Sequence, residues 1–236
     1  AIVGIAVWVS YQASARLTRG HLHGSAIAIM LGLLAAYVGG VITGGGRGIA
    51  DLEIFAGIGL MGGAMLRDFA IIATAFGVNT RELARAGASG VISLFVGVFV
   101  SFGIGAVVAY AFGYTDPVSM TTIGGGAATY IVGPVTGAAI GASSDVIALS
   151  IAAGLIKSML VMAGTPFVAP LIGLNNPRSA MIYGGLMGTT SGVAGGLAAT
   201  DERLVPYGAM TATFYTGLGA LLGPSVIFVA IRAIMG

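Results

Sequence analysis

The sequence predicts an all-α integral membrane protein, a polytopic bundle of transmembrane helices with discontinuous, re-entrant helical hairpins. Three observations lead to this fold class. Hydrophobic residues make up 57% of the 236 residues and charged residues only 8%, whereas a soluble domain is about 25% charged. Apolar blocks long enough to span a bilayer alternate with short polar segments. Glycine is abundant, with 41 residues, as in membrane helices that pack closely or are broken.

We expect residues 1–236 to form a single integral membrane domain in the lipid bilayer. The first apolar run, residues 2–13, is shorter than the roughly 20 residues that a spanning helix needs, so we expect the first helix to be truncated at its N-terminus. The sequence contains no cysteine, which excludes disulfides and thiolate metal sites. The net charge of +2 is too small to indicate a nucleic-acid partner.

Polar segments divide the first half of the chain into four apolar blocks, residues 1–14, 25–43, 52–76 and 87–112. The loops that follow the first and third blocks carry more arginine than the other two loops. Because cytoplasmic loops are enriched in basic residues, we expect the loops with Arg16 and Arg81 to lie in the cytoplasm.

The second half contains two apolar segments that glycine and hydroxyl residues interrupt. The first spans residues 118–144 and includes the Gly133-Pro134 pair, and the second spans residues 179–200. Non-helical backbone at membrane depth is tolerated only where it is buried in protein or lines a polar cavity. We therefore expect two short half-helices with an unwound tip in each segment, separated by a helix of about 18 residues that begins at Asp145.

Paired broken segments are typical of secondary transporters, which bind substrate and coupling ions where such segments meet. They also leave room for an inverted repeat. One similarity, between a Ser-Ala pair at Ser25 followed by Gly39 and one at Ser179 followed by Gly195, differs in spacing by two residues and carries little weight.

Arg67 and Asp68 lie inside the third apolar block. An arginine at a helix centre costs about 2.5–3.5 kcal/mol on insertion scales, so both residues need partners from another helix, a cavity or a ligand. We assign Arg67 to substrate binding. The alternative is a structural ion pair, or a helix end from which both side chains reach the membrane interface.

Asp145 is the predicted sodium ligand, because a carboxylate beside hydroxyls and free carbonyls supplies the oxygen atoms that a hard cation prefers. The alternative is that Asp145 or Ser144 only caps the following helix, and both roles are compatible. The full predicted sodium set is Asp145, Ser143, Ser144, Thr121, Thr122 and the carbonyl at Gly133.

Residues 188–192 form a run of small and hydroxyl side chains that would suit a carboxylate at the start of a half-helix. We assign Thr189, Thr190 and Ser191 to substrate binding, together with Thr129 in the other broken segment. The alternative is helix packing, which uses the same residue types. Lys157 either reaches the interface or faces the cavity, and His21 and His23 lie in a basic loop. No arrangement of nucleophile and base is present, so we do not expect an enzyme.

Six stretches of the sequence resemble one known family. They are GSAIAI (24–29), FAGIGLMGGAMLRDFAI (55–71), VSMTTIG (118–124), TYIVGPVTGAAIGASSDVIALSIA (129–152), NPRSAMIYGGLMGT (176–189) and LAATDERLVPYGAMTATF (197–214). They resemble the MadM subunit of the bacterial malonate:sodium symporter over essentially the whole chain. The resemblance implies sodium-coupled uptake of malonate in the bacterial cytoplasmic membrane, sodium as the coupling ion with no cofactor, and a small membrane partner, MadL. It assigns no ligand residue by residue.

The physics of malonate transport agrees with this resemblance. Malonate is a dianion at neutral pH, and its import against an interior-negative potential costs about 2.3 kcal/mol per charge per 100 mV. Two coupled cations offset a dianion, or one does so with a monoprotonated substrate. We predict a sodium-coupled malonate importer that works by alternating access as the large subunit of a two-component carrier. The alternatives are another ion- or proton-coupled carboxylate carrier, a membrane subunit of a malonate-metabolising enzyme complex, or an assembly subunit.

Overall fold

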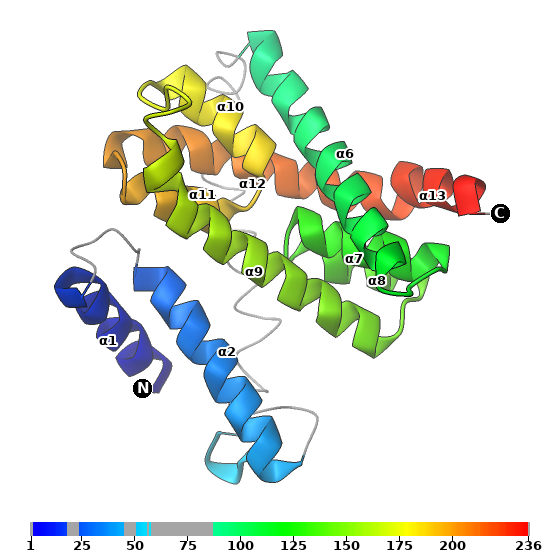
Figure 1. The fold of residues 1–236 in the computed structure, drawn as a ribbon, viewed down its shortest axis with the longest axis horizontal. Coiled ribbons are helices and arrows are strands. Elements are labelled where there is room, and N and C mark those ends of the chain that lie inside the picture. Colours follow the sequence, from blue (N-terminus) through cyan, green and yellow to red (C-terminus); the bar gives the residue numbers. More distant parts are fainter. Residues whose placement is uncertain (1, 18–23, 45–50, 56, 58–86, 236) are drawn as a thin grey trace. The chain divides into compact units, whose positions relative to one another are not determined.

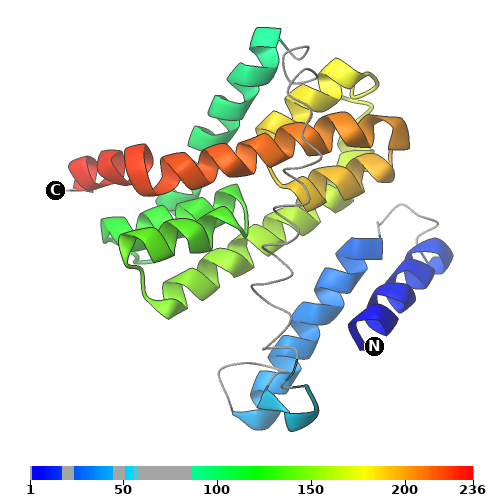
Figure 2. The ribbon, with the colours of Figure 1, turned by 180° about the vertical axis from the view of Figure 1, so that it is seen from behind.

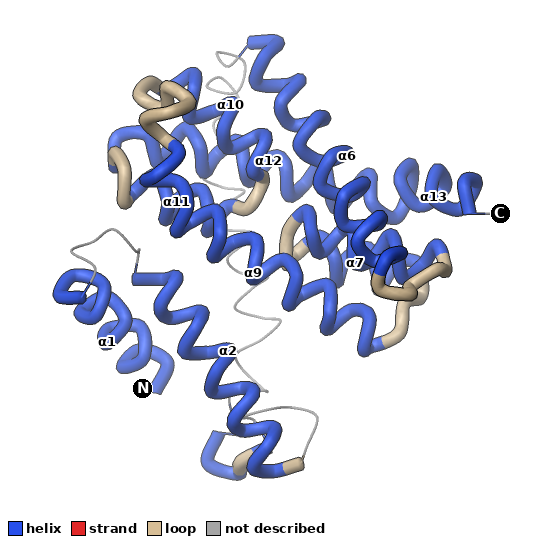
Figure 3. Tube along the Cα trace, in the orientation of Figure 1, coloured by secondary structure: helices blue, strands red, loops and turns tan. Residues whose placement is uncertain are grey.

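The computed structural model describes residues 2–17, 24–44, 51–55, 57 and 87–235. Within these ranges every regular element is a helix (Figure 3), which confirms the predicted all-α class. The chain divides into two compact units, residues 1–78 and 79–236. Whether they make up one membrane domain stays a prediction.

The first unit contains α1 (Ile2–Leu17), α2 (Gly24–Thr43) and the short 3₁₀ helix η2 (Glu53–Phe55). Helices α1 and α2 pack side by side (Figure 1). A Cβ atom at Gly24 would lie 2.6 Å from the ring of Tyr11, so the absence of a side chain at residue 24 permits this contact.

The second unit contains three helices long and apolar enough to cross a membrane. They are α6 (Gly87–Ala111), α9 (Ser144–Val168) and the helix that continues from α12 (Val205–Leu222) through the π-helical η4 (Gly223–Ile227) into α13 (Phe228–Met235). A 25-residue helix such as α6 is about 37 Å long and exceeds the roughly 30 Å of a hydrocarbon core.

The exposed face of α6 carries large apolar side chains. Ile104 and Val107 are exposed, whereas Ser93 and Gly97 are buried beside larger residues such as Phe102. An exposed apolar face suits contact with lipid, and the buried small residues let membrane helices approach closely.

Helices α7 (Pro117–Ala128) and α8 (Val132–Ile140) form the first hairpin. Gly125 lies against Gly133, and Thr122 lies against Gly137. The two arms are therefore antiparallel, and the chain reverses at residues 129–131, which we call the first tip. The predicted interruption of segment 118–144 is present, with both ends of the hairpin on the same side.

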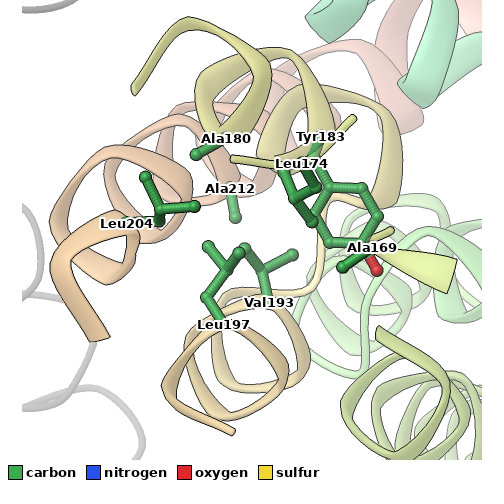
Figure 4. Packing of buried hydrophobic residues seen from close by; sticks show 8 residues of the cluster. All are labelled: Ala169, Leu174, Ala180, Tyr183, Val193, Leu197, Leu204 and Ala212. Atoms are coloured by element: carbon green, nitrogen blue, oxygen red, sulfur yellow. The ribbon is translucent and has the colours of Figure 1, made fainter. Parts of the chain in front are cut away.

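Helices α10 (Pro177–Met187) and α11 (Thr190–Ala198) form the second hairpin, and residues 188–189 between them form the second tip. Gly188 has a φ of +73°, a conformation that favours glycine. Ala180 from the first arm and Leu197 from the second both contact Gly208 of α12, so the chain folds back on itself. Figure 4 shows the cluster that joins these arms to α12.

The two hairpins lie at opposite ends of the long helices (Figures 1 and 2). Gly105 of α6 lies against Gly124 of α7, and Ala109 shares a cluster with Met120, so α6 and α7 are antiparallel. By contrast, Ser150 of α9 lies against Gly126, and the next turn of α9 contacts residue 130, so α9 is parallel to α7. Hence α6 and α9 run in opposite directions, and each is followed by its own hairpin. This is an inverted repeat.

The sequence carries this repeat in two places. DPVSMTTIGGGAAT (116–129) corresponds to NPRSAMIYGGLMGT (176–189), with a capping residue, proline, serine, a glycine pair and threonine at the same positions. SLFVGVFVS (93–101) in α6 corresponds to SIAAGLIKS (150–158) in α9. These pairs differ from the similarity between Ser25 and Ser179 considered above.

Candidate functional site

The two tips meet on one stretch of α9. A Cβ atom at Gly154 would lie 2.2 Å from the backbone nitrogen of Tyr130 in the first tip. One turn later, the Ser158 hydroxyl lies 2.8 Å from the Ser191 hydroxyl at the start of α11. The first tip and the first turn of α11 are thus both held against residues 154–158, as expected of a transporter with inverted repeats.

Lys157 lies on this stretch and is the only lysine of the chain. Its Nζ donates to the Ser101 hydroxyl at 3.1 Å and to the Ala128 carbonyl at 2.9 Å. It also lies 5.4 Å from the centre of the Tyr215 ring, within the range of a cation–π contact. Among the described residues, no carboxylate forms an ion pair with Lys157. Within the described part of the chain, this half-buried ammonium therefore contacts neutral groups alone.

Tyr215 of α12 connects the ammonium with the second tip. Its side chain is fully buried, and its hydroxyl donates to the Gly97 carbonyl at 3.1 Å. A Cβ atom at Gly188 would lie 2.3 Å from the ring. One tyrosine thus contacts α6, Lys157 and the second tip, which brings the lysine and the start of α11 to the same ring.

Thr129 and Thr189 are repeat-related and lie at the two tips, yet their hydroxyls differ. The Thr129 hydroxyl accepts hydrogen bonds from the N–H groups of Ile131 and Val132 at 3.2 and 3.0 Å. Thr189 has an exposed fraction of 0%, and its hydroxyl has no hydrogen-bond partner among the described residues. It forms no side-chain cap on α11. The start of α11 therefore offers a free hydroxyl and uncapped N–H groups, the groups that bind an anion at a helix N-terminus.

The predicted substrate residues within the described ranges are Thr129 in the first tip and Thr189, Thr190 and Ser191 at the second tip and the start of α11. Thr190 is the first residue of α11 and is half-buried, as is Ser191. Arg67, also assigned to the substrate, lies outside the described residues, as do Asp68, His21 and His23. The role of Arg67 stays a prediction.

The predicted sodium residues lie in other places. Ser143, Ser144 and Asp145 are exposed at the start of α9, where the Ser143 hydroxyl accepts from the Val146 N–H at 3.5 Å. Lys157 follows Asp145 by twelve positions in the same helix, which corresponds to about 18 Å along α9.

The remaining members of the sodium set lie inside the first hairpin. The Thr121 and Thr122 hydroxyls donate to carbonyls within α7, at 2.6 and 2.7 Å. Gly133 provides close packing, since a Cβ atom there would lie 2.5 Å from the Ser150 hydroxyl. The predicted sodium ligands therefore do not lie around one point. Their positions do not exclude sodium binding at the start of α9, so the assignment of these residues to sodium stays a prediction.

Lys157 is not among the residues assigned to the site from sequence, because an isolated lysine in an apolar helix can equally extend to the interface. The repeat contains the missing signal. Ser150, Gly154 and Ser158 of α9 match Ser93, Gly97 and Ser101 of α6, and the position of Lys157 is valine in the other half, Val100. Lys157 is thus a charged residue in one repeat at a position where the other repeat has an apolar residue.

A cavity of about 610 Å³ lies elsewhere, between α9 and α10, and its lining includes Leu160, Val168 and Ile182. Its apolar walls do not suit a dianion. Within the described ranges, no group of three histidine, aspartate or glutamate side chains could hold a metal ion.

The family of this chain follows from a comparison of its sequence with known families. The family model of the malonate/sodium symporter MadM subunit matches residues 1–235. The chain belongs to the MadM family. No curated protein and no solved structure matches it. Family membership makes this MadM chain a subunit of a sodium-coupled malonate transporter, and the three membrane-length helices agree with that role.

Proposed function

We propose that this MadM chain imports malonate by alternating access and binds the dianion between the second tip and Lys157. The observation that carries the proposal is the Lys157 ammonium, which lies where the two hairpins meet and has no anionic partner among the described residues. A charge inside the membrane is costly and marks substrate pathways.

The second tip supports the recognition of a carboxylate. The first N–H groups of α11 have no side-chain cap from Thr189, and the Thr189 and Ser191 hydroxyls lie beside them. Half-helix N-termini bind the anionic groups of transported substrates. Thr190 supplies one such N–H group, and Thr129 in the first tip lies next to Ala128, which contacts the lysine. Arg67 is proposed as a second cation for the dianion.

The inverted repeat supports alternating access. Two hairpins that enter from opposite ends and meet on α9 can each close one side of a shared site. The hairpins contact the long helices through glycine. Gly97 of α6 lies against α10, and Gly154 of α9 lies against the first tip. Such contacts let the hairpins slide or separate without moving large side chains.

Sodium is the coupling ion of the family. We propose that the start of α9 binds one sodium ion through Asp145, Ser143 and Ser144. Thr121, Thr122 and the Gly133 carbonyl, the other predicted sodium ligands, lie inside the first hairpin and are not assigned to this same ion. A carboxylate and hydroxyls are suitable oxygen ligands for a hard cation.

We further propose that the transporter consists of this chain and the small membrane subunit MadL, in the bacterial cytoplasmic membrane. The family is defined as a subunit, which supports a second component. The apolar faces of the described long helices support a location in the bilayer.

Reconstitution into liposomes tests the proposal. Labelled malonate uptake is measured with an inward sodium gradient, with and without the partner subunit, for the wild type, Lys157→Met and Lys157→Arg. We expect sodium-driven uptake that Lys157→Met abolishes and Lys157→Arg retains in part, because arginine keeps the charge. Uptake by Lys157→Met at the wild-type rate would exclude Lys157 from the malonate site.

A further inference from the structure

Helix α7 ends at Ala128, and the carbonyls of its last turn have no N–H partner within the helix. They carry the partial negative charge of a helix C-terminus. The Gly126 carbonyl also faces α9, because a Cβ atom at Gly154 would lie 2.8 Å from its oxygen. Of these oxygens, the Ala128 carbonyl contacts the Lys157 ammonium, together with the Ser101 hydroxyl. They are the kind of ligand that transporters use for sodium at the ends of broken helices.

The Lys157 ammonium already occupies this oxygen site as a cation, at 2.9 Å from the Ala128 carbonyl and 3.1 Å from the Ser101 hydroxyl. Malonate at the second tip attracts the same ammonium. Lysine carries its charge on a flexible four-carbon chain, so Nζ can turn from one partner to the other. When it turns to malonate, the buried oxygens lose their cation.

The repeat shows that the cation belongs to one half only. In the second half the equivalent of Ser101 is Ser158, whose hydroxyl bonds to Ser191 rather than to an ammonium. Val100 occupies the position equivalent to Lys157 and is exposed. The first hairpin therefore presents a helix C-terminus with a cation, and the second presents a helix N-terminus without a cap.

We infer that the Lys157 ammonium and a coupling sodium ion are alternative occupants of one oxygen site, formed by the Ala128 carbonyl and the Ser101 hydroxyl, and that malonate exchanges one for the other. The exchange rests on the proposed malonate site. It couples the two substrates, because malonate withdraws the ammonium and sodium replaces it. Each ligand then strengthens the binding of the other by the same factor.

Equilibrium binding of radiolabelled sodium tests this inference. The full chain in lipid nanodiscs, with its partner subunit where purification requires it, is measured with and without saturating malonate. We expect malonate to tighten sodium binding by the wild type by about tenfold. Lys157→Met is expected to bind sodium about tenfold more tightly than the wild type without malonate, and malonate should have no further effect. Val100→Met, the repeat-related control, should behave as wild type.

Two outcomes separate this inference from the proposed function. Loss of malonate binding by Lys157→Met, with sodium affinity unchanged in the absence of malonate, overturns the shared site and leaves the malonate site standing. If Lys157→Met instead keeps the wild-type malonate affinity and binds sodium more tightly, the ammonium and sodium share the oxygen site, but Lys157 does not bind malonate.

A second variant guards against misfolding of Lys157→Met. Ser101→Ala keeps the lysine but removes one sodium ligand, so we expect about tenfold weaker sodium binding in the presence of malonate. Malonate affinity in the absence of sodium should stay the same or rise, because the lysine loses a competing partner. Unchanged sodium affinity in folded Ser101→Ala overturns the inference.

Discussion

Thr129 and Thr189 occupy equivalent positions in the two halves, yet only the Thr129 hydroxyl accepts hydrogen bonds from N–H groups at the start of the helix that follows it. Thr129 accepts from two backbone N–H groups, whereas the buried Thr189 hydroxyl has no partner among the described residues. A buried hydroxyl without a hydrogen bond is costly. The difference predicts that Thr129 stabilises its hairpin, and it supports the proposal that the Thr189 hydroxyl contacts the substrate.

Replacement of Thr129 by valine is therefore expected to affect stability, and replacement of Thr189 by valine to affect malonate binding. Thr129→Val should lower the free energy of unfolding by about 1 kcal/mol, since it removes the acceptor of two backbone N–H groups. Thr189→Val should leave stability nearly unchanged, because no hydrogen bond is lost, and should weaken malonate binding by about tenfold if the hydroxyl contributes about 1.4 kcal/mol to the bound anion.

Denaturation curves and malonate titrations on the two purified variants check this contrast. A loss of stability in Thr189→Val as large as that in Thr129→Val would show that the Thr189 hydroxyl has a structural partner instead.

The fold could be predicted from sequence because its signals are local. Few charges, apolar blocks and runs of glycine and threonine predict spanning helices and broken segments wherever they occur. The hairpin of residues 117–140 was predictable for this reason, as was the break at Gly188. Which side chains meet at the tips depends on packing between helices distant in sequence.

Lys157 and Asp145 illustrate this limit. The sequence around a lysine in an apolar helix is the same whether its side chain extends to the membrane interface or contacts Ala128. Only the packing of α9 on α7 distinguishes these two orientations. Asp145 follows two serines, a pattern that suits both a cation site and a helix start. In the structure Ser143, and neither Ser144 nor Asp145, is the capping residue of α9. Asp145 is exposed in the first turn, where a carboxylate interacts favourably with the helix N-terminus, and this position does not test the binding of sodium.

Glycine contacts between the halves lead to a second prediction. A Cβ atom at Gly97 would lie 2.2 Å from the Gly185 carbonyl, whereas at Gly103 it would meet nothing within 4 Å. Gly97→Ala should therefore destabilise the protein by about 1–3 kcal/mol and reduce uptake, because α10 must move away from α6. Gly103→Ala, on the same helix, should have little effect. Thermal unfolding and uptake assays compare the pair, and equal stability of both variants would contradict the close packing of α6 and α10.

Asp116 leads to a prediction about pH. Burial opposes ionisation of its carboxyl, but hydrogen bonds from Ser119 and from the backbone of Asp116 and Val118 together outweigh this effect and hold the pKa of the carboxyl below its ordinary value of 3.8. The carboxylate accepts from the Ser119 N–H at 2.8 Å and caps α7. Because the pKa is lower in the folded protein, the cap contributes its full stability above about pH 4 and loses it as the pH falls through the folded-state value.

Asparagine provides the matched control for Asp116, since Asn176 caps α10 at the equivalent position. Asp116→Asn should keep most of the cap and remove its dependence on pH. Hydrogen exchange of the first turn of α7, measured between pH 3 and 6 on both proteins, checks the prediction. The same acid-induced opening in Asp116→Asn would assign the effect to another group.

Asp145→Asn tests the proposed sodium site at the start of α9. If the carboxylate binds sodium, its replacement should raise the sodium concentration for half-maximal uptake severalfold and leave expression intact, because a charged ligand becomes a neutral one. If Asp145 only interacts with the helix N-terminus, the variant should lose about 0.3–1 kcal/mol of stability and keep the wild-type sodium dependence. Asp116→Asn controls for the loss of a charge at a helix start. Uptake measured against sodium concentration at saturating malonate separates the two roles, and a curve that overlays the wild type reduces Asp145 to a helix-start charge.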